Sequence, residues 1–149
     1  MAHTHPPAVV TMSTLRSVPD VYDQESCFLA GTVGIVEEDY SGLASSEDRV
    51  RPFAEALRKY HAVILPNHGA ITRGDTIQQA VFLMMLLEMM CQRHLVVAGA
   101  SRATGIAAKP IAPEVARATQ RELMSLKALP LVWSDFMTRL RQTDSDLFT

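Results

Sequence analysis

Short apolar runs alternate along the chain with longer stretches in which apolar residues recur at helical spacing. The clearest short run is residues 62–66, four apolar residues ended by a proline, which predicts a central strand buried on both faces. Residues 27–36 carry apolar side chains around two glycines and predict one or two short strands. A further strand is predicted over residues 1–5, because the two prolines that follow cannot donate to a ladder.

Two helices are predicted in the first half of the chain. The first is short and runs from about Ala8 to Leu15. The second runs to about Tyr60 from an N-cap at Ser45 or Ser46, and two acidic residues in its first turn suit the positive end of the helix dipole. Its inner face is predicted to consist of Ala54, Ala56 and Leu57.

The longest helix is predicted from about Thr76 to Val97. Asp75 lies three residues before Gln78, a capping-box pattern that marks the start, and Gly99 is expected to end the helix. Apolar residues cover nearly its whole circumference. We therefore expect this segment to be the central packed helix of the domain.

The C-terminal part is predicted to hold a loop over residues 101–112 and two more helices, over residues 113–126 and 131–141. Strands and helices thus alternate, which predicts the α/β class rather than a helix bundle or a β-sandwich. A chain of 149 residues that is 48% hydrophobic can bury one core but hardly two, so we expect a single domain over residues 1–149.

The composition of the chain limits the kinds of partner that it can bind. The net charge is −2 and the 14 basic residues are scattered, so there is no electrostatic footprint for nucleic acid or an anionic membrane. The apolar block at residues 80–97 is interrupted by polar groups such as Glu88 and Arg93, which argues against a membrane span. Cys27 and Cys91 have no metal-type spacing, and a reduced cytoplasmic location is expected. The expected partner is a small molecule or another subunit.

The candidate chemistry lies in the histidines. His3 and His5 are one residue apart on a predicted strand, and alternate residues of a strand share a face, so both imidazoles can chelate one ion. His68 follows the buried strand directly, and the glycine after it tolerates tight geometry. Such a histidine projects from the carboxyl end of a strand, where α/β sheets bind ligands. Three histidines with an open fourth position are typical of a catalytic zinc site.

Two motifs carry a resemblance to a known family. The segments A-H-T-H-P-P at residues 2–7 and I-L-P-N-H-G-A-I at residues 64–71, with Gly74 and the apolar helix through Glu88, resemble the class II aldolase/adducin family. The resemblance covers about residues 2–100. It implies a three-layer α/β/α domain around a central, mainly antiparallel sheet, with the second motif on a strand-to-helix turn.

The resemblance also implies an activity. The family includes fuculose-phosphate and rhamnulose-phosphate aldolases, ribulose-phosphate 4-epimerase and several hydroxy-acid decarboxylases. A member is expected to be a metal-dependent lyase that acts on a small hydroxy-carbonyl compound, such as a sugar phosphate, through a metal-stabilised enediolate. Zinc is the leading metal, with manganese and iron as alternatives. A homotetramer is implied, in which Trp133 and Phe136 reach a neighbour's cleft. The implied metal ligands are His3, His5 and His68.

The chain departs from the family before the first motif. Family members carry roughly half of the domain ahead of the H-x-H strand, including the phosphate-binding loop and the catalytic acid/base residue, whereas only Met1 and Ala2 precede His3 here. We therefore expect an N-terminally truncated chain that cannot complete the reaction alone. A non-catalytic, adducin-like interaction module is the alternative function. Retention of all three histidines favours the enzyme lineage.

Other polar residues have competing interpretations. Glu88 is a candidate to orient a ligand histidine through its other ring nitrogen, although a glutamate satisfied by backbone or arginine is the favoured interpretation. Asn67 is expected to hold the turn, with contact to substrate as a lesser role. His61 and His94 are expected to be structural. The acidic loop at residues 37–40 is expected to be exposed rather than to line the cleft.

Overall fold

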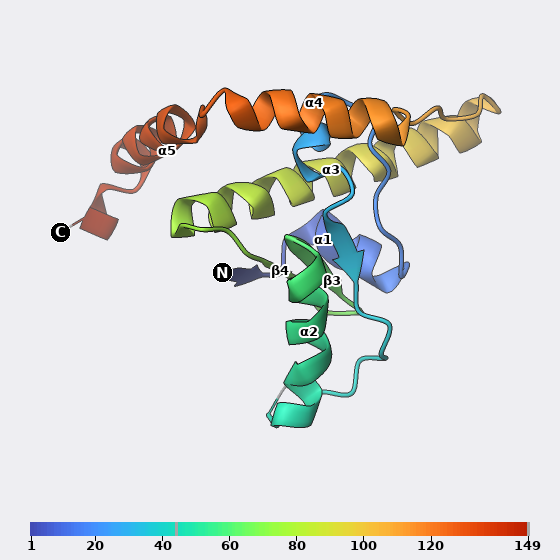
Figure 1. Ribbon diagram of the computed structural model, residues 1–149, viewed down its shortest axis with the longest axis horizontal. Coiled ribbons are helices and arrows are strands. Elements are labelled where there is room, and N and C mark those ends of the chain that lie inside the picture. Colours follow the sequence, from blue (N-terminus) through green and yellow to red (C-terminus); the bar gives the residue numbers. More distant parts are fainter. Residues whose placement is uncertain (44, 149) are drawn as a thin grey trace.

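The computed structural model describes residues 1–43 and 45–148 (Figure 1). Its four short strands form one sheet. The order across the sheet is β1-β4-β3-β2. β1 pairs antiparallel with β4, β4 pairs antiparallel with β3, and β3 pairs parallel with β2. The strands are β1 (Ala2–Thr4), β2 (Val33–Ile35), β3 (Ala62–Leu65) and β4 (Gly69–Thr72).

Five α-helices and two 3-10 helices complete the described part of the chain. They are α1 (Pro7–Thr14), η1 (Glu25–Leu29), α2 (Glu47–Lys59), α3 (Ile77–Thr104), α4 (Pro113–Ser125), α5 (Leu129–Thr143) and η2 (Ser145–Phe148). The five predicted α-helices are therefore confirmed, with shifted ends. So is the α/β class.

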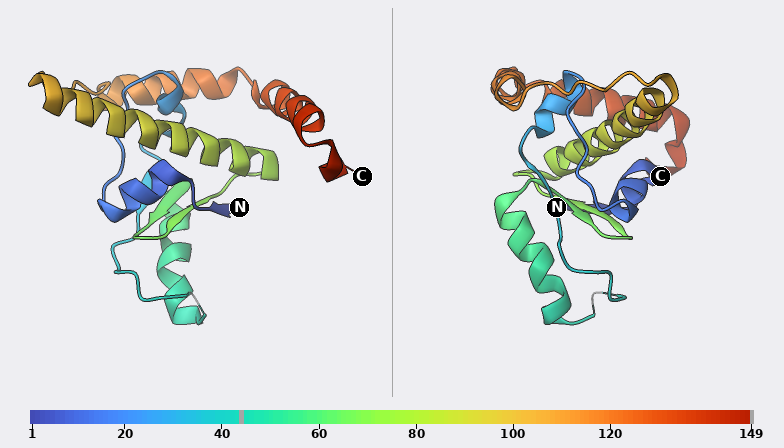
Figure 2. Two further views of the ribbon diagram at one scale, coloured as in Figure 1. Left: turned by 180° about the vertical axis from the view of Figure 1, so that it is seen from behind. Right: turned by 90° about the vertical axis from the view of Figure 1, so that its right-hand side faces the viewer.

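Helices cover both faces of the sheet. α1 and α3 lie against one face and α2 lies against the other, as the two views of Figure 2 agree. β3 is central, and each of its four residues is buried, because alternate side chains enter opposite cores: Ile64 packs with the α1 and α3 side chains, and Val63 packs with those of α2. The prediction of a strand buried on both faces is confirmed.

The inner face of α2 differs from the prediction. Ala56 and Leu57 pack against the sheet as expected, but Phe53 takes the third position and Ala54 is exposed. Phe53 lies three and four residues before the other two, which is the spacing of one helix face. The predicted first turn is correct, with Ser46 as the N-cap residue.

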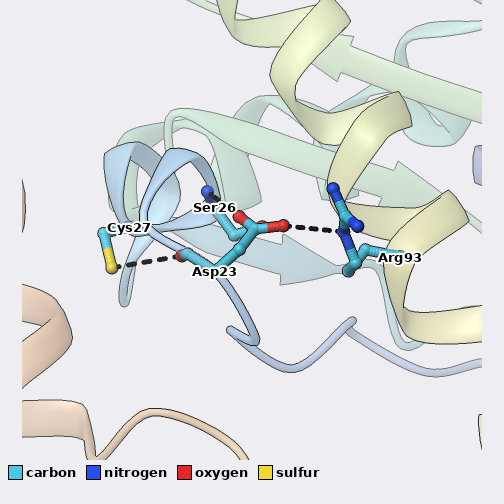
Figure 3. Close-up of polar contacts among 4 residues, drawn as sticks. All are labelled: Asp23, Ser26, Cys27 and Arg93. Carbon is cyan, nitrogen blue, oxygen red and sulfur yellow. Dashed lines mark hydrogen bonds and ion pairs between the residues drawn. The ribbon is translucent and has the colours of Figure 1, made fainter. Parts of the chain in front are cut away.

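Residues 27–36 form one strand and not two. The first part belongs to η1, because Asp23 Oδ1 accepts a hydrogen bond of 2.7 Å from the Ser26 N–H and fixes a tight turn (Figure 3). Asp23 Oδ2 also accepts from Arg93 Nε at 2.8 Å, which ties this turn to α3. Burial raises the pKa of Asp23, but the Ser26 hydrogen bonds and the Arg93 charge outweigh it, and the net shift is downward.

The ends of α3 also differ from the prediction. Its N-cap is Thr76, whose hydroxyl accepts from the Gln79 N–H, so the capping pattern lies one residue later than predicted. Gly99 does not end the helix, which continues to Gly105, where φ is +71°. A glycine inside a helix, such as Gly99, destabilises it by only about 1 kcal/mol, so the helix continues past it. The residue after the last turn often adopts a left-handed conformation, which glycine adopts without strain, and Gly105 has this position.

By length and composition alone, α3 is the one helix of the described residues that could cross a membrane. Core helices of soluble proteins meet the same criterion. Its buried side chains, among them Leu83, Leu87 and Met90, form the core beneath the sheet together with α1. The absence of a membrane partner stays a prediction.

Candidate metal centre

Residues 66–68 form the loop of a hairpin between β3 and β4. The predicted strand-to-helix turn at this point is therefore wrong, because a second strand of four residues follows before α3. The His68 N–H donates to the Leu65 carbonyl at 3.1 Å, and Asn67 has a φ of +55°, the arrangement of a type II turn with proline at its first central position. Asn67 holds the turn, as predicted.

Gly69 serves a different purpose from the one predicted. Its φ is not in the left-handed region; instead, β1 passes very close to it. A Cβ at this position would lie 2.5 Å from the Thr4 carbonyl oxygen and 2.7 Å from His5 Cδ2. The glycine is needed so that the strand bearing the first two histidines can lie against the turn bearing the third.

The register of β1 and β4 brings the three histidines together. His3 pairs with Ile71 and Thr4 with Ala70, so His5, the residue after β1, lies at the start of β4 beside the turn that carries His68. The ring centroids of the three imidazoles lie between 4.8 and 5.0 Å apart. One ligand nitrogen from each ring lies within 4.8 Å of the ligand nitrogens of the other two rings. These residues, 3, 5 and 68, are the ones that the sequence singled out.

The protonation of this cluster suits a cation. His3 Nδ1 lies 2.9 Å from the Ala70 carbonyl oxygen, and since a carbonyl only accepts, Nδ1 carries a hydrogen; in the neutral ring this leaves the lone pair of Nε2 for a cation. Burial, followed by the charges of His3 and His5, lowers the pKa of His68. A neutral imidazole is the form that binds metal, so this shift favours binding at a lower pH.

The donor set fits a divalent transition metal. Zinc–nitrogen bonds are about 2.0–2.1 Å long, so two nitrogens on one ion cannot be 4.8 Å apart. The three imidazoles must therefore move closer together when they bind zinc. His3 and His5 are exposed, while His68 is half-buried and held by its turn. Among the described residues no carboxylate belongs to this group. Imidazoles alone suit zinc, copper, iron and nickel better than calcium or magnesium.

Glu88 lies elsewhere, at the N-terminus of α1. Its Oε1 accepts from the Ala8 N–H at 3.1 Å and its Oε2 from the Val9 N–H at 3.0 Å. A carboxylate at this position satisfies two of the unpaired N–H groups and the positive helix end. The interpretation as a glutamate satisfied by backbone fits these contacts. Glu88 therefore fixes α1, which begins two residues after His5.

The remaining predicted residues lie apart from the cluster or beside it. His94 Nδ1 accepts from the Asp20 N–H at 3.0 Å, a structural contact. His61 lies at the opposite end of β3 from His68. The acidic loop is exposed, as predicted, but it also lines a small depression of about 190 Å³ together with His68, and the Tyr40 ring centroid lies 6.0 Å from that of His68.

Sequence reasoning missed a larger cleft beside the cluster. It lies between α2 and the sheet, has a volume of about 710 Å³, and includes His3 and His68 in its wall. Phe53 and Arg73 also line it. The alternation that places Ile71 on this face also places Arg73 there, so extending the period-two pattern beyond the turn would have found it.

The chain is similar in sequence to known proteins. The chain matches the family described as "Class II Aldolase and Adducin N-terminal domain" over residues 1–95. It is 40% identical over 90 residues to "4-hydroxy-3-prenylphenylpyruvate oxygenase/4-hydroxy-3-prenylbenzoate synthase" of Streptomyces roseochromogenus subsp. oscitans, covering 60% of this chain and 31% of the relative. It is 37% identical over 90 residues to "Decarboxylase NovR" of Streptomyces niveus, covering 60% of this chain and 32% of that relative. The chain thus spans about a third of the length of these curated relatives.

Solved structures share the fold. An aldolase II superfamily protein from Pseudomonas syringae superposes with a TM-score of 0.78 at 20% identity, over 97% of this chain and 57% of that one. L-fuculose 1-phosphate aldolase from Glaciozyma antarctica PI12 superposes with a TM-score of 0.61 at 30% identity, over 78% and 41% of the two chains. Since the family match covers well over half of the 149 residues, this chain belongs to the class II aldolase and adducin family.

Proposed function

We propose that the chain carries the metal centre of a metal-dependent lyase-type enzyme. The ligands are His3, His5 and His68, and zinc is the first candidate ion, ahead of manganese and iron. The observation that carries this proposal is the meeting of three ring nitrogens from two distant segments within 4.8 Å. Imidazoles packed this closely, with one tautomer fixed by the Ala70 carbonyl, form a donor set rather than a chance surface group.

The reaction class is proposed from the relatives and the donor set together. The similar proteins are named as an aldolase, a decarboxylase and an oxygenase/synthase. A bound divalent ion would supply Lewis-acid polarisation of substrate oxygens, which assists C–C bond cleavage beside a carbonyl. We infer a small hydroxy-carbonyl compound as substrate. The chain's own part is to hold three imidazoles close together, two of them, His3 and His68, in the wall of a mainly apolar cleft.

The other expectations stay proposals of the same kind. They are a homo-oligomer and a cytoplasmic location. The whole protein's activity is also a proposal, because the chain spans about a third of the curated relatives.

A non-catalytic, adducin-like interaction module is the alternative. Such a module does not need a metal, so nothing would require its three histidines to lie close together. The close approach of β1 to Gly69, which only a glycine permits, favours the metal centre, since it serves to bring His5 against His68.

Elemental analysis of the purified chain tests the proposal. We expect one equivalent of zinc after zinc loading and dialysis, and at least a tenfold loss of affinity in His68→Ala. His61→Ala is the matched control, because it removes an imidazole at the other end of β3 and should keep full stoichiometry. A wild-type chain without stoichiometric metal, or equal loss in both variants, would count against the metal centre.

A further inference from the structure

The cleft between α2 and the sheet has a mainly apolar wall. It is lined mainly by apolar side chains, including Val50, Phe53, Leu57, Leu65 and Ile71. Its volume of about 710 Å³ lies within the range of pockets that enclose a small organic ligand. A sugar would leave most of its hydroxyl groups without partners there, which is costly, so this wall favours an apolar body.

The polar groups of the cleft lie at its two ends. His3 and His68, two of the proposed metal ligands, lie at one end. Arg58 and Arg73 lie near the other, because Arg73 follows the last residue of β4 whereas His68 precedes its first. Arg73 is two residues beyond Ile71, the register partner of His3, so its backbone is about 7 Å further along the strand.

Both arginines are available to an anion. In the chain outside positions 44 and 149, no acidic side chain forms an ion pair with either guanidinium. Arg73 is half-buried and its Nε donates to the Tyr60 carbonyl at 3.1 Å, which fixes the planar group while leaving other N–H donors free. A carboxylate accepts two such donors at once.

We propose that this cleft binds the aromatic body of a carboxylate-bearing substrate. The ring packs between Phe53 and Ile71, the carboxylate faces Arg73 and Arg58, and the opposite end of the molecule faces His3 and His68. The spacing of about 7 Å along the strand suits one ring with a short side chain. The role of this ligand as a substrate rests on the proposed metal centre, whereas its binding in the cleft does not.

Binding of 3-phenylpropanoate to the metal-free chain, measured by ligand-observed NMR titration, tests the proposal. Its amide, 3-phenylpropanamide, has the same ring without the charge, and glycerol 3-phosphate is an anion without the ring. We expect the acid to bind at least fivefold more tightly than the amide and than glycerol 3-phosphate. Equal affinity for acid and amide, or tighter binding of glycerol 3-phosphate, would overturn the proposal.

Variants locate the site. Ala54→Phe fills the cleft from an exposed helix position and should weaken binding of the acid at least tenfold. Ala98→Phe, at an exposed position of α3, is the matched control and should have no effect. Arg58→Gln, also at an exposed position, should at least halve the preference for acid over amide, and Arg73→Gln should abolish it, with unfolding midpoints recorded for each. Unchanged binding in Ala54→Phe would overturn the proposal.

Two further readouts separate this inference from the proposed function. Zinc content is measured on the same samples. Acid binding without zinc uptake contradicts the metal centre but not the proposed binding site in the cleft. Zinc uptake without acid binding contradicts the binding site in the cleft but not the metal centre. Sedimentation is measured with and without the acid. A dimer that Ala54→Phe dissociates and that excludes the acid would assign the cleft to a second copy of the chain and overturn the proposal.

Discussion

The Nδ1 atom of His3 donates a hydrogen bond to the carbonyl oxygen of Ala70, 2.9 Å away and 67 residues later in the chain. The bond joins β1 to the hairpin strand that follows His68. It fixes the tautomer of one proposed ligand while the strand pairing fixes its position. Changes that separate β1 from β4 should therefore weaken metal binding even when no histidine is altered.

The substitution Gly69→Ala should separate β1 from β4 most directly. The new Cβ would meet the Thr4 carbonyl oxygen at 2.5 Å, and backbone cannot move aside without breaking the pairing of β1. We expect a loss of about 1–3 kcal/mol in unfolding free energy, as for other overpacked sites, and at least a tenfold loss of zinc affinity.

Gly99→Ala is the matched control for that change. Nothing lies within 4 Å of a Cβ at Gly99, and the position is inside α3. Alanine should stabilise the helix by roughly 0.5–1 kcal/mol and leave zinc affinity unchanged. Urea denaturation and zinc titration measure both variants, and equal behaviour of the two would contradict the role assigned to Gly69.

Two substitutions at Asn67 distinguish a role in the turn from a role in metal binding. With φ at +55°, Asn67→Gly should keep the turn, whereas Asn67→Ala should cost about 1 kcal/mol or more. Zinc affinity should follow the turn and be nearly normal in the glycine variant. A glycine variant that folds normally but binds zinc tenfold more weakly would show that the amide itself contributes.

Glu88→Gln tests the attachment of α1. The amide oxygen accepts only one of the two N–H bonds now made by the carboxylate, and the negative charge at the helix N-terminus is lost. We expect a loss of about 1–2 kcal/mol in unfolding free energy. Glu55→Gln, at an exposed position of α2, serves as control and should change stability by less than about 0.5 kcal/mol.

Asp23 should make stability depend on pH in the acid range. The pKa of its carboxyl is lowered in the folded chain, so its contribution is complete above the unfolded pKa of about 3.9 and is lost as the pH falls through the folded value. The stability difference between wild type and Asp23→Asn should therefore be largest near pH 6 and shrink below about pH 4.

The control for the pH experiment is Asp135→Asn, because Asp135 also pairs with an arginine but its side chain is 56% exposed. An exposed pair contributes little, so its pH profile should match that of the wild type. Thermal unfolding at a series of pH values measures all three chains. A constant difference for Asp23→Asn down to pH 2.5 would refute the assignment.

The sequence predicted the meeting of His3, His5 and His68 better than the elements around them. The alternation of His3 and His5 survives because β1 is paired up to Thr4, which carries the period of two as far as His5. The position of His68 is predictable from the buried run before it. The strand after His68 was mistaken for the approach to a helix, because β4 has only four residues, too few for a period of two to be recognised.

Two other errors have local causes. The segment before β2 turns into η1 through a hydrogen bond from Ser26 to Asp23, a side-chain contact that apolar periodicity does not register. The cleft and Arg73 were missed because they depend on the packing of α2 against the sheet, and only the tertiary fold sets that distance.

The most direct test of the metal centre follows the ring nitrogens of all five histidines by ¹⁵N NMR during a zinc titration. We predict that His3 is a Nδ1–H tautomer before zinc is added, and that one equivalent shifts its Nε2 together with one nitrogen each of His5 and His68, while His61 and His94 stay unchanged. Shifts at His61 or His94, or none at the three clustered histidines, would contradict the account.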